Sequence, residues 1–297
     1  MVKISVLTSL YNCKNYLSGF FAAIEQIVNK EECEFLLLHN APQKEEIEII
    51  DKNILGKTWF RYINIEHREN LYATWNRGIN LSLGEYITVW NVDDVRFPNS
   101  ILLQKNALDN NPQAAIAYGD IFGSSIYGQQ GTKFHQSPEW KGNEKEFYRG
   151  YFMSCFQMWR KSIHDKLGYY DEQFKCVGDF DFQIRAALHF PFVKVNQPLG
   201  IYLENQPQKI SNSNLHPIEN NVVFRRYGVY EQIDFTYYFS SLSLYNRKQL
   251  LFFGQTHAFQ IKSPFSIAYK SIGLIKGLIY FPFHLLRSLK KYLQRLV

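Results

Sequence analysis

The sequence predicts an α/β protein in which a Rossmann-like, mostly parallel sheet is flanked by helices. Short apolar runs that suit buried strands alternate with segments of helical periodicity over roughly residues 3–205. Such alternation implies parallel strands joined by right-handed crossovers. The clearest run, residues 86–90, is uncharged and β-branched or aromatic, and it stops at Asn91 before the adjacent acids Asp93 and Asp94. Ligands of open α/β sheets bind at this end of the strands.

The composition is that of a globular protein. Of the 297 residues, 46% are hydrophobic and 20% are charged, so the chain can form one large or two small domains. The four cysteines are far apart and form no CxxC pair, which indicates neither a zinc site nor a disulfide framework and favours a reducing compartment. Residues 1–5 lead straight into a strand-like segment without the apolar stretch of a signal peptide. We therefore expect a cytoplasmic protein.

The elements can be placed in chain order. Apolar or alternating runs predict strands at residues 3–8, 35–38, 61–65, 86–90 and 116–118. Helical spacing predicts helices around residues 20–28, in the Glu-rich segment after Pro42, and at 70–83, 101–109 and 184–188. The Gly-rich, polar stretch 119–145 is expected to be a loop or a hairpin. The helices form the crossovers and therefore flank the sheet.

Two pairs of acids stand where chemistry is expected. Asp93 and Asp94 follow a strand, and adjacent carboxylates there suit a hard divalent cation, Mn2+ or Mg2+, because such ions take oxygen ligands and hold substrate phosphates. The alternative for this pair is a solvated turn. Asp179 and Asp181 begin a helix, where the macrodipole favours negative charge. Helix capping is therefore the alternative to catalysis for the second pair.

Several motifs carry a resemblance to a known family. They are Thr8-Ser9-Leu10-Tyr11-Asn12, Asn76-Arg77-Gly78, Gly84-Glu85-Tyr86, Asn91-Val92-Asp93-Asp94 and Gly178-Asp179-Phe180-Asp181. In this spacing they resemble the family 2 glycosyltransferases of the GT-A fold, which are inverting enzymes that use a nucleotide-sugar donor. The resemblance covers roughly residues 3–205. The chain departs from the family pattern at His39, Asn70, Trp75, Asn91 and Gly178.

The resemblance implies a role for each matching residue. The residues that would bind the nucleotide sugar, with UDP or dTDP as the nucleotide, are Thr8, Tyr11, Asn12, Asn40, Asn76 and Asp93. Asp94 would be the more direct metal ligand, and the metal would neutralise the departing diphosphate. Asp179 would be the general base that removes the proton of the acceptor hydroxyl.

Three further residues are lesser candidates. Asp181 is a rival base, although Arg185 lies one helical turn further on and could pair with it, which would make Asp181 structural. Asn91 stands at the first acidic place of the family motif. His216 would lie on a loop that closes over the diphosphate. The chain has no Gln/Arg-x-x-Arg-Trp segment of the kind seen in processive synthases, so we expect transfer of a single sugar.

The C-terminal region differs in charge from the rest of the chain. Six basic residues and no acid lie in residues 263–297. We expect a catalytic domain over residues 1–225 and a helical region over 226–297, which ends in an amphipathic basic segment suited to an anionic membrane surface. Its uncharged run of ten residues, 277–286, is too short to span a bilayer, which needs about 20. The alternative is a helix packed on the catalytic domain or on a second subunit, and nothing indicates nucleic acid as a partner.

The sequence therefore predicts a metal-dependent, inverting glycosyltransferase that acts in lipid-linked surface polysaccharide synthesis, peripheral on the inner face of the cell membrane. A sugar nucleotidyltransferase is one alternative, but it normally has a Gly-rich, basic loop after the first strand, and residues 8–14 contain none. A catalytically inactive nucleotide-sugar-binding protein is the other alternative, favoured by the departures from the motifs. The sequence predicts no oligomeric state.

Overall fold

The computed structural model describes residues 2–142, 146–147, 153–204, 206, 209, 213–229, 232–237, 240–243 and 248–259. Its strands are β1 Ile4–Leu10, β2 Cys33–Asn40, β3 Phe60–Ile65, β4 Tyr86–Val89, β5 Val95–Arg96, β6 Ile116–Ser124, β7 Lys133–His135, β8 Met158–Arg160, β9 Phe192–Leu203, β10 Gln249–Phe252 and β11 Gln255–Ala258. Its α-helices are α1 Lys14–Glu25, α2 Lys44–Ile54, α3 Leu71–Leu81, α4 Ser100–Asp109, α5 His164–Leu167, α6 Gly178–Ala187, α7 Leu215–Tyr227 and α8 Ser240–Ser243. Short 3-10 helices lie at Lys30–Glu32, Lys161–Ile163 and Phe235–Tyr237.

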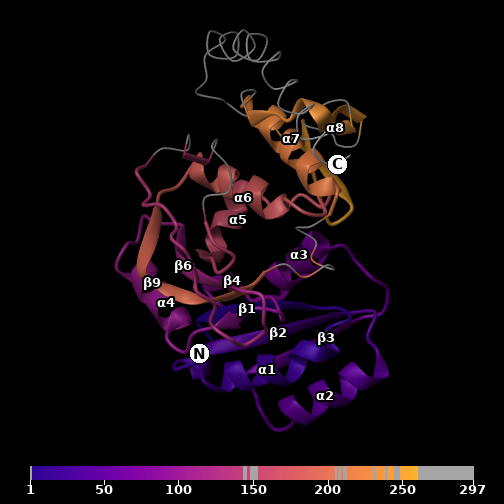
Figure 1. Cartoon of the computed structure of the whole chain (residues 1–297), viewed down its shortest axis with the longest axis vertical. Helices are drawn as coiled ribbons and strands as arrows, with labels where there is room; N and C mark the ends of the chain where they lie inside the picture. The colour runs from indigo at the N-terminus through magenta and orange to yellow at the C-terminus, as the bar shows by residue number, and fades with distance from the viewer. Residues whose placement is uncertain are drawn as a thin grey trace.

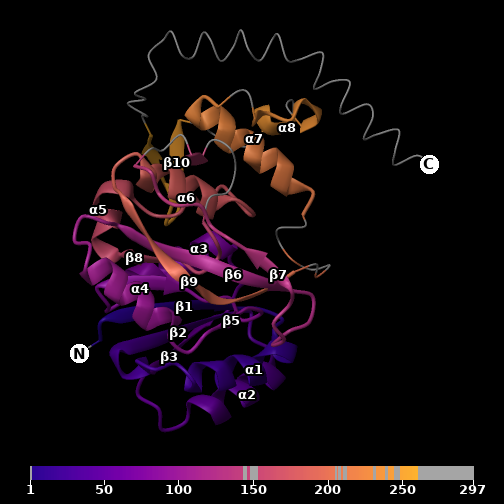
Figure 2. The ribbon, with the colours of Figure 1, turned by 60° about the vertical axis from the view of Figure 1, so that its left-hand side comes forward.

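One large sheet forms the centre of the molecule (Figures 1 and 2). Its strand order is β3-β2-β1-β4-β8-β6-β9-β5, and β7 pairs with β6 outside this path. The first four strands are parallel to one another, and β6 is parallel to β9. β8 runs antiparallel to its two neighbours, β4 and β6. Most paired residues are thus in parallel register, which confirms the predicted fold class.

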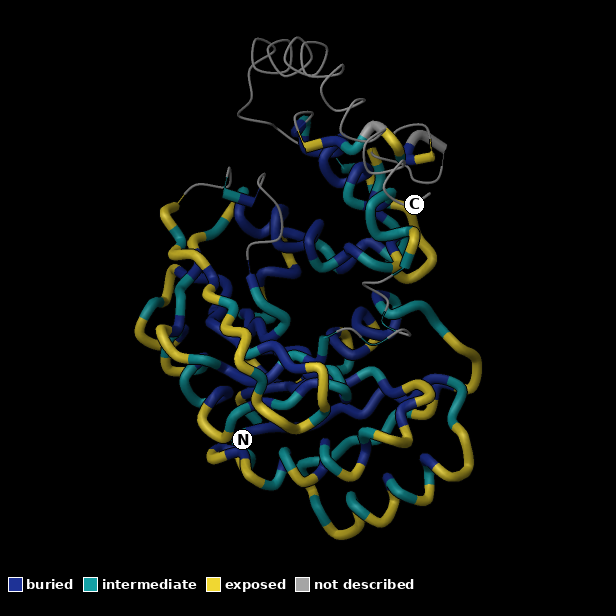
Figure 3. The backbone as a smooth tube through the Cα atoms, viewed as in Figure 1, coloured by how far each residue is buried: buried dark blue, intermediate teal, exposed yellow. Residues whose placement is uncertain are grey.

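Helices cover both faces of this sheet. Successive side chains of a strand point to opposite sides, so the apolar strands have buried side chains on each face. Leu7 and Leu36 belong to a core cluster with side chains of α3 and α6. Their neighbours Val6 and Phe35 belong to a second cluster with side chains of α1 and α2. The central strands β1, β2 and β4 are buried almost throughout and dark blue in Figure 3, whereas the outer faces of α1 and α2 are exposed.

The predicted elements before residue 190 are present, and the main omission is β9. Its centre, Asn196-Gln197-Pro198, is polar and interrupts the apolar pattern by which a buried strand is recognised. The pairing of β9 with β6 shifts register around Asp120, so these polar residues lie at an irregularity of the ladder. The polar stretch 119–145 contains a hairpin, because β6 continues through Ser124 and pairs with β7.

The region after residue 225 differs from the helical prediction. α7 runs through the expected domain boundary between residues 225 and 226. Residues 249–258 form the antiparallel hairpin β10–β11, so the predicted helix is wrong there. The two turn residues, Phe253 and Gly254, have φ angles of 52° and 70°, the left-handed conformation that two-residue hairpin turns require. The apolar content of this segment predicted a helix, whereas Gly254 permits the left-handed turn that makes a hairpin.

α7 and the hairpin pack against the preceding part of the chain. Arg226 of α7 pairs with Asp181 of α6, and the Leu251 N–H of β10 donates to Asp171. Within the part of the chain that the structure describes, none of the helices has both the length and the hydropathy needed to cross a bilayer. The basic segment 263–297 lies outside the described residues, so the membrane-associating helix stays a prediction.

Candidate active site

A cavity of about 950 Å³ lies at the carboxyl ends of β1, β2 and β4. Tyr11 follows β1, Asn40 ends β2 and Asp93 follows β4, and all three line the cavity. A further wall comes from the first turn of α6 and from α7, which contribute Asp179 and His216. His216 lies in the first turn of α7, so the prediction that it lies on a loop is wrong. The location is the one where open α/β sheets bind ligands, and the volume lies within the range of about 300–1,000 Å³ of small-molecule sites.

The structure brings most predicted site residues to this cavity, namely Tyr11, Asn12, Asn40, Asn91, Asp93, Asp179 and His216. The residues that lie elsewhere are Thr8, Asn76, Asp94 and Asp181.

Thr8 is fully buried in β1, and its neighbour Ser9 faces the cavity instead. The Asn76 amide nitrogen donates to the Tyr170 carbonyl at 2.9 Å and to the Glu172 carboxylate at 2.8 Å. Asn76, which lies on α3, therefore holds residues 170–172 against this helix. Its position does not support the predicted nucleotide contact.

The first acid pair is arranged in the reverse of the expected order. Asp93 lines the cavity, whereas Asp94 is 1% exposed and lies behind it. One Asp94 oxygen accepts the Leu203 N–H at 3.1 Å and the other accepts the Asn91 amide at 3.2 Å. Burial and the adjacent Asp93 charge raise the pKa of Asp94 to about 7. Asp94 thus ties the strand end to β9, and Asp93 is the carboxylate that a ligand in the cavity would meet.

Lys209 is a cavity residue that the sequence analysis missed. Its ammonium nitrogen lies 3.2 Å from an Asp93 oxygen and 3.6 Å from an Asp94 oxygen, and 3.7 Å from the centroid of the Tyr202 ring. Burial opposes the charge, but the two carboxylates raise the pKa of Lys209 above its ordinary value. The negative charge of the acid pair is therefore partly neutralised by a cationic side chain of the protein, Lys209.

The acid pair also fits a divalent cation, provided that the substrate contributes ligands. Among the described residues, no cluster of three or more His, Cys, Asp or Glu side chains is arranged to hold a metal ion. Divalent cations in phosphate-transfer sites are commonly held by one or two carboxylates together with substrate phosphates. Asp93 at the cavity wall, with Asp94 beside it, is such a donor set. The Lys209 ammonium contacts the same oxygens, so a cation would compete with it.

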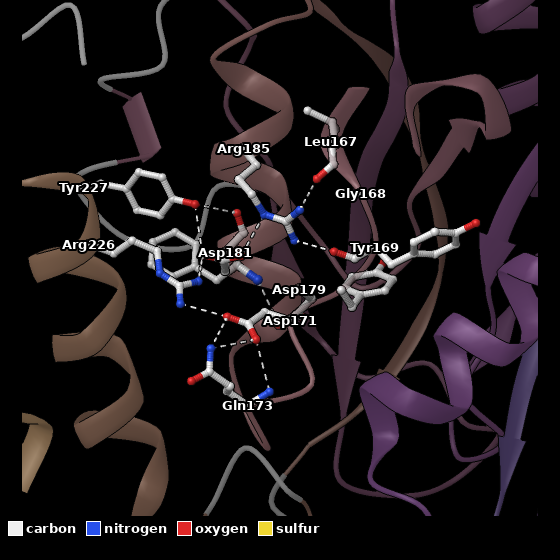
Figure 4. A network of polar contacts seen from close by, with 12 residues as sticks. Leu167, Gly168, Tyr169, Asp171, Gln173, Asp179, Asp181, Arg185, Arg226 and Tyr227 are labelled. Atoms are coloured by element: carbon white, nitrogen blue, oxygen red, sulfur yellow. Dashed lines mark hydrogen bonds and ion pairs between the residues drawn. The ribbon is translucent and has the colours of Figure 1, made fainter. Parts of the chain in front are cut away.

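The second acid pair divides into one cavity residue and one buried residue. Figure 4 shows the polar contacts around the buried one, Asp181. Asp179 lines the cavity. Asp181 is fully buried and accepts from Arg185 at 2.9 Å, Arg226 at 2.7 Å and Tyr227 at 2.9 Å. Burial alone would raise the pKa of Asp181, but Arg226 and Arg185 hold it below its ordinary value. The predicted pairing with Arg185 is confirmed, and the buried position of Asp181 leaves Asp179 as the candidate base.

Polar and aromatic groups near the ends of β1 and β2 form another wall. The Arg68 guanidinium lies 3.9 Å from the centroid of the Tyr11 ring and donates to the Tyr11 hydroxyl at 3.2 Å. Tyr11 is 42% exposed, so this ring presents a flat surface in the cavity. The Asn40 amide oxygen accepts the Glu69 N–H at 3.0 Å, which fixes the amide at the end of β2.

Two departures from the family motifs are largely core residues. His39 is fully buried, and its ring nitrogens lie 3.0 Å from the Tyr62 hydroxyl and 3.0 Å from the Glu46 carboxylate. Trp75 is 6% exposed and packs its ring against Tyr72 and Tyr170, with centroids 5.5 and 5.4 Å away. Both replacements are thus accommodated by packing partners.

The remaining missed residues differ in how well the sequence could have indicated them. Tyr72 stands four residues before Asn76, the first residue of a matched motif, so helical spacing places both on one face of α3, and this spacing was a usable signal. Arg68 and Lys209 belong to no motif. Their partners Tyr11 and Asp93 are far away in the sequence, so only the fold reveals these contacts.

The sheet and its acid-lined cavity together have the architecture of a GT-A glycosyltransferase. A family model described as "Glycosyl transferase family 2" matches residues 5–170, which is more than half of the chain. The chain therefore belongs to glycosyltransferase family 2, as the sequence motifs predicted.

Individual relatives agree with this assignment. The chain is 27% identical over 189 residues to the uncharacterised glycosyltransferase MJ1057 of Methanocaldococcus jannaschii, a match that covers 62% of this chain and 64% of the relative, less than two thirds of its length. A crystal structure of TarS 1-349 from S. aureus in complex with UDP-GlcNAc has a TM-score of 0.66 at 15% identity, over 95% of this chain and 73% of that one. The mannosyltransferase PcManGT of Pyrobaculum calidifontis, in complex with GDP-Man and Mn2+, has a TM-score of 0.53 at 8% identity, over 77% and 63% of the two chains. These structural likenesses establish the shared fold.

Proposed function

We propose that this enzyme transfers a single sugar from a UDP- or dTDP-sugar to a hydroxyl group of a glycan acceptor, with inversion at the anomeric carbon. The observation that carries the proposal is that Asp93 and Asp179, from distant parts of the chain, line one cavity. A carboxylate at each of two walls provides one group for the diphosphate side of the donor and one for the acceptor hydroxyl.

The donor nucleotide would lie along the wall formed by the ends of β1 and β2. The exposed Tyr11 ring, backed by Arg68, suits stacking against a base, and the polar groups of Asn12 and Asn40 suit hydrogen bonds to it. A pyrimidine nucleotide is supported by the fold likeness to TarS, which was crystallised with UDP-GlcNAc and with UDP.

The diphosphate would lie beside Asp93. Asp93, backed by Asp94, would hold Mn2+ or Mg2+ jointly with the phosphate oxygens, and the bound cation would offset the charge that develops on the leaving group. The likeness to PcManGT, whose crystals contain Mn2+, supports this assignment. Lys209 lies at the same carboxylates, so its ammonium would move toward the phosphates when a cation takes its place.

Asp179 would act as the general base. The acceptor oxygen forms a bond to the anomeric carbon while the bond from that carbon to the diphosphate oxygen breaks, and the leaving group keeps the electron pair. The proton of the acceptor hydroxyl passes to the Asp179 carboxylate. A single displacement of this kind inverts the configuration at the carbon.

Turnover of a panel of nucleotide sugars with Mn2+ tests this function. We expect Asp179→Asn to lower kcat by roughly 100- to 10,000-fold, the usual contribution of a general base, while nucleotide binding measured by calorimetry stays within about twofold.

Asp93→Asn should instead weaken binding of the nucleotide in the presence of Mn2+. A matched control is Asp109→Asn, which removes a carboxylate on α4 outside the cavity and should leave both quantities unchanged. Near-normal turnover by Asp179→Asn would refute the base assignment, and nucleotide binding without turnover of any donor would point to the inactive binding protein.

The acceptor that we propose is a lipid-linked glycan, reached from the inner surface of the cell membrane. The support is the basic, amphipathic pattern of residues 263–297, which suits the surface of an anionic membrane. Deletion of residues 264–297 should shift the protein from pelleted anionic vesicles to the supernatant. Equal partitioning of the full-length and shortened proteins would rule out this mode of attachment.

A further inference from the structure

Gly178 and Tyr72 are in unusually close contact at the start of α6. A Cβ atom added at residue 178 would lie 2.8–2.9 Å from three carbons of the Tyr72 ring, which is closer than real Cβ atoms approach other atoms. No larger residue fits at 178 while the ring keeps its place. Glycine at 178, which departs from the family motif, therefore leaves room for the Tyr72 ring.

Tyr72 is held firmly in this place. Its side chain is 1% exposed, and it packs against Trp75 and Tyr170 with ring centroids 5.5 and 5.7 Å away. Its hydroxyl group donates to the Asp179 oxygen Oδ1 at 3.2 Å. The backbone N–H of Phe180 donates to the same oxygen at 3.0 Å. Two donors, one from α3 and one from α6, thus converge on one oxygen of the candidate base.

We propose that Tyr72 is a positioning residue for the transfer reaction, whose hydroxyl group fixes the orientation of the Asp179 carboxylate and stabilises its ionised form. The inference rests on the proposed function, because it takes Asp179 as the base. A hydrogen bond from a neutral donor favours the charged form of a carboxylate, and a base must be both ionised and aimed at the acceptor hydroxyl. The bulk of Tyr72 excludes a side chain at 178, and its hydroxyl supplies the polar contact there.

Other titratable groups lie close to Asp179 or line the same cavity, and the test must leave them unchanged. From the segment before α6 they are Tyr170 and Cys176, from α7 they are His216 and Glu219, and at the other cavity walls they are Glu69, Arg68, Asp93, His135, Glu204 and Lys209. Glu219 accepts the N–H groups of residues 175–177, which fixes the start of α6 from the α7 side. Replacement of Tyr72 by Phe leaves all of these groups in the chain and removes one hydroxyl.

The test is the pH dependence of kcat for Tyr72→Phe. Loss of the donor should lower kcat at neutral pH by roughly 10- to 100-fold, the usual effect of a hydrogen bond to a charged group. The acid limb of the profile should move to higher pH by about one unit, because the carboxylate is then protonated more easily. The dissociation constant for the nucleotide should stay within twofold. A fall of equal size at every pH would overturn the proposal, because a purely structural defect acts in that way.

Tyr227→Phe is the matched control, because it also removes a tyrosine hydroxyl from an aspartate of α6, here Asp181 at 2.9 Å. It should leave the pH profile in place. Gly178→Ala should displace the Tyr72 ring and lower kcat as Tyr72→Phe does, and the double variant should be no worse than the poorer single variant. Additive losses would contradict a shared route through the hydroxyl.

Carboxyl carbon NMR separates this proposal from the proposed function. The Asp179 signal, assigned by its loss in Asp179→Asn, should titrate at higher pH in Tyr72→Phe than in the unsubstituted protein, whether or not any donor is turned over. An unshifted titration would refute the role of Tyr72. A shifted titration in a protein that turns over no nucleotide sugar would uphold the contact and refute the catalytic function.

Discussion

The two acid pairs of the cavity have the same layout but different partners. In each pair one carboxylate, Asp93 or Asp179, lines the cavity, and the other, Asp94 or Asp181, is buried behind it. Asp93 and Asp94 share one ammonium group, that of Lys209, with a side chain 11% exposed. Asp181 is held by guanidinium groups that are almost completely buried. We therefore predict that the charge beside the first pair can be exchanged for another cation, whereas the charge beside the second pair is fixed.

The ionisation of the buried acids reflects this difference. Burial and the adjacent Asp93 raise the pKa of Asp94 to about 7, since one shared ammonium does not fully offset the cost of two neighbouring carboxylates. For Asp181 the arginines outweigh burial, and its pKa lies below the ordinary value. The first site is thus short of positive charge, which is consistent with the proposed binding of a cation there. The second site is fully compensated and serves to join α6, α7 and the segment around residue 171.

The largest expected effect comes from breaking the fixed site. Arg226 pairs with Asp181 at 2.7 Å and with Asp171 at 2.8 Å, and none of the three side chains is exposed. Arg226→Met keeps an apolar stem of similar length but leaves two buried carboxylates without this partner. We expect the free energy of unfolding to fall by about 3–5 kcal/mol, measured by urea denaturation.

A surface ion pair provides the control for this prediction. Arg77 pairs with Glu69, and the arginine side chain is 46% exposed. Arg77→Met should therefore cost at most about 1 kcal/mol. If Arg226→Met were as mild as Arg77→Met, the buried network would not be the element that joins α7 to the catalytic part of the chain, and the contrast between the two acid pairs would fail.

The features predicted from the sequence are those with a local signal. Apolar runs placed β1 to β4, and acids directly after a strand or at the start of a helix indicated the cavity wall, because strand ends and helix starts are local events. Local patterns do not show which acid of a pair faces the ligand. The order of Asp93 and Asp94 follows from hydrogen bonds to Leu203 and Asn91, and the former belongs to a strand that the sequence did not reveal.

The features that escaped prediction depend on contacts between distant parts of the chain. Lys209 reaches the acid pair and Tyr72 reaches Asp179, and no spacing rule connects residues so far apart. The same reason explains why departures from the motifs could not be interpreted. From the sequence alone, Gly178 suggests a loss of catalytic function. The structure shows instead that glycine at this position makes room for the Tyr72 ring.

The smaller predicted effect concerns the exchangeable site. Lys209→Gln removes the ammonium group from the Asp93 and Asp94 oxygens while keeping a polar side chain of nearly the same length. Because Mn2+ and the ammonium would use the same carboxylates, the affinity for Mn2+ in the absence of nucleotide should rise about tenfold, which corresponds to about 1.4 kcal/mol. Calorimetric titration with Mn2+ measures this directly and requires no turnover.

Lys209→Arg is the control that separates charge from side-chain identity. A guanidinium group keeps the positive charge at the acid pair, so Mn2+ binding should stay within about twofold of that of the unsubstituted protein. Equal Mn2+ affinity of the Gln and Arg variants would mean that the ammonium and the cation do not share the carboxylates. In that case Lys209 would be a permanent part of the wall, like Arg226 behind Asp181, and the two acid pairs would be alike rather than different.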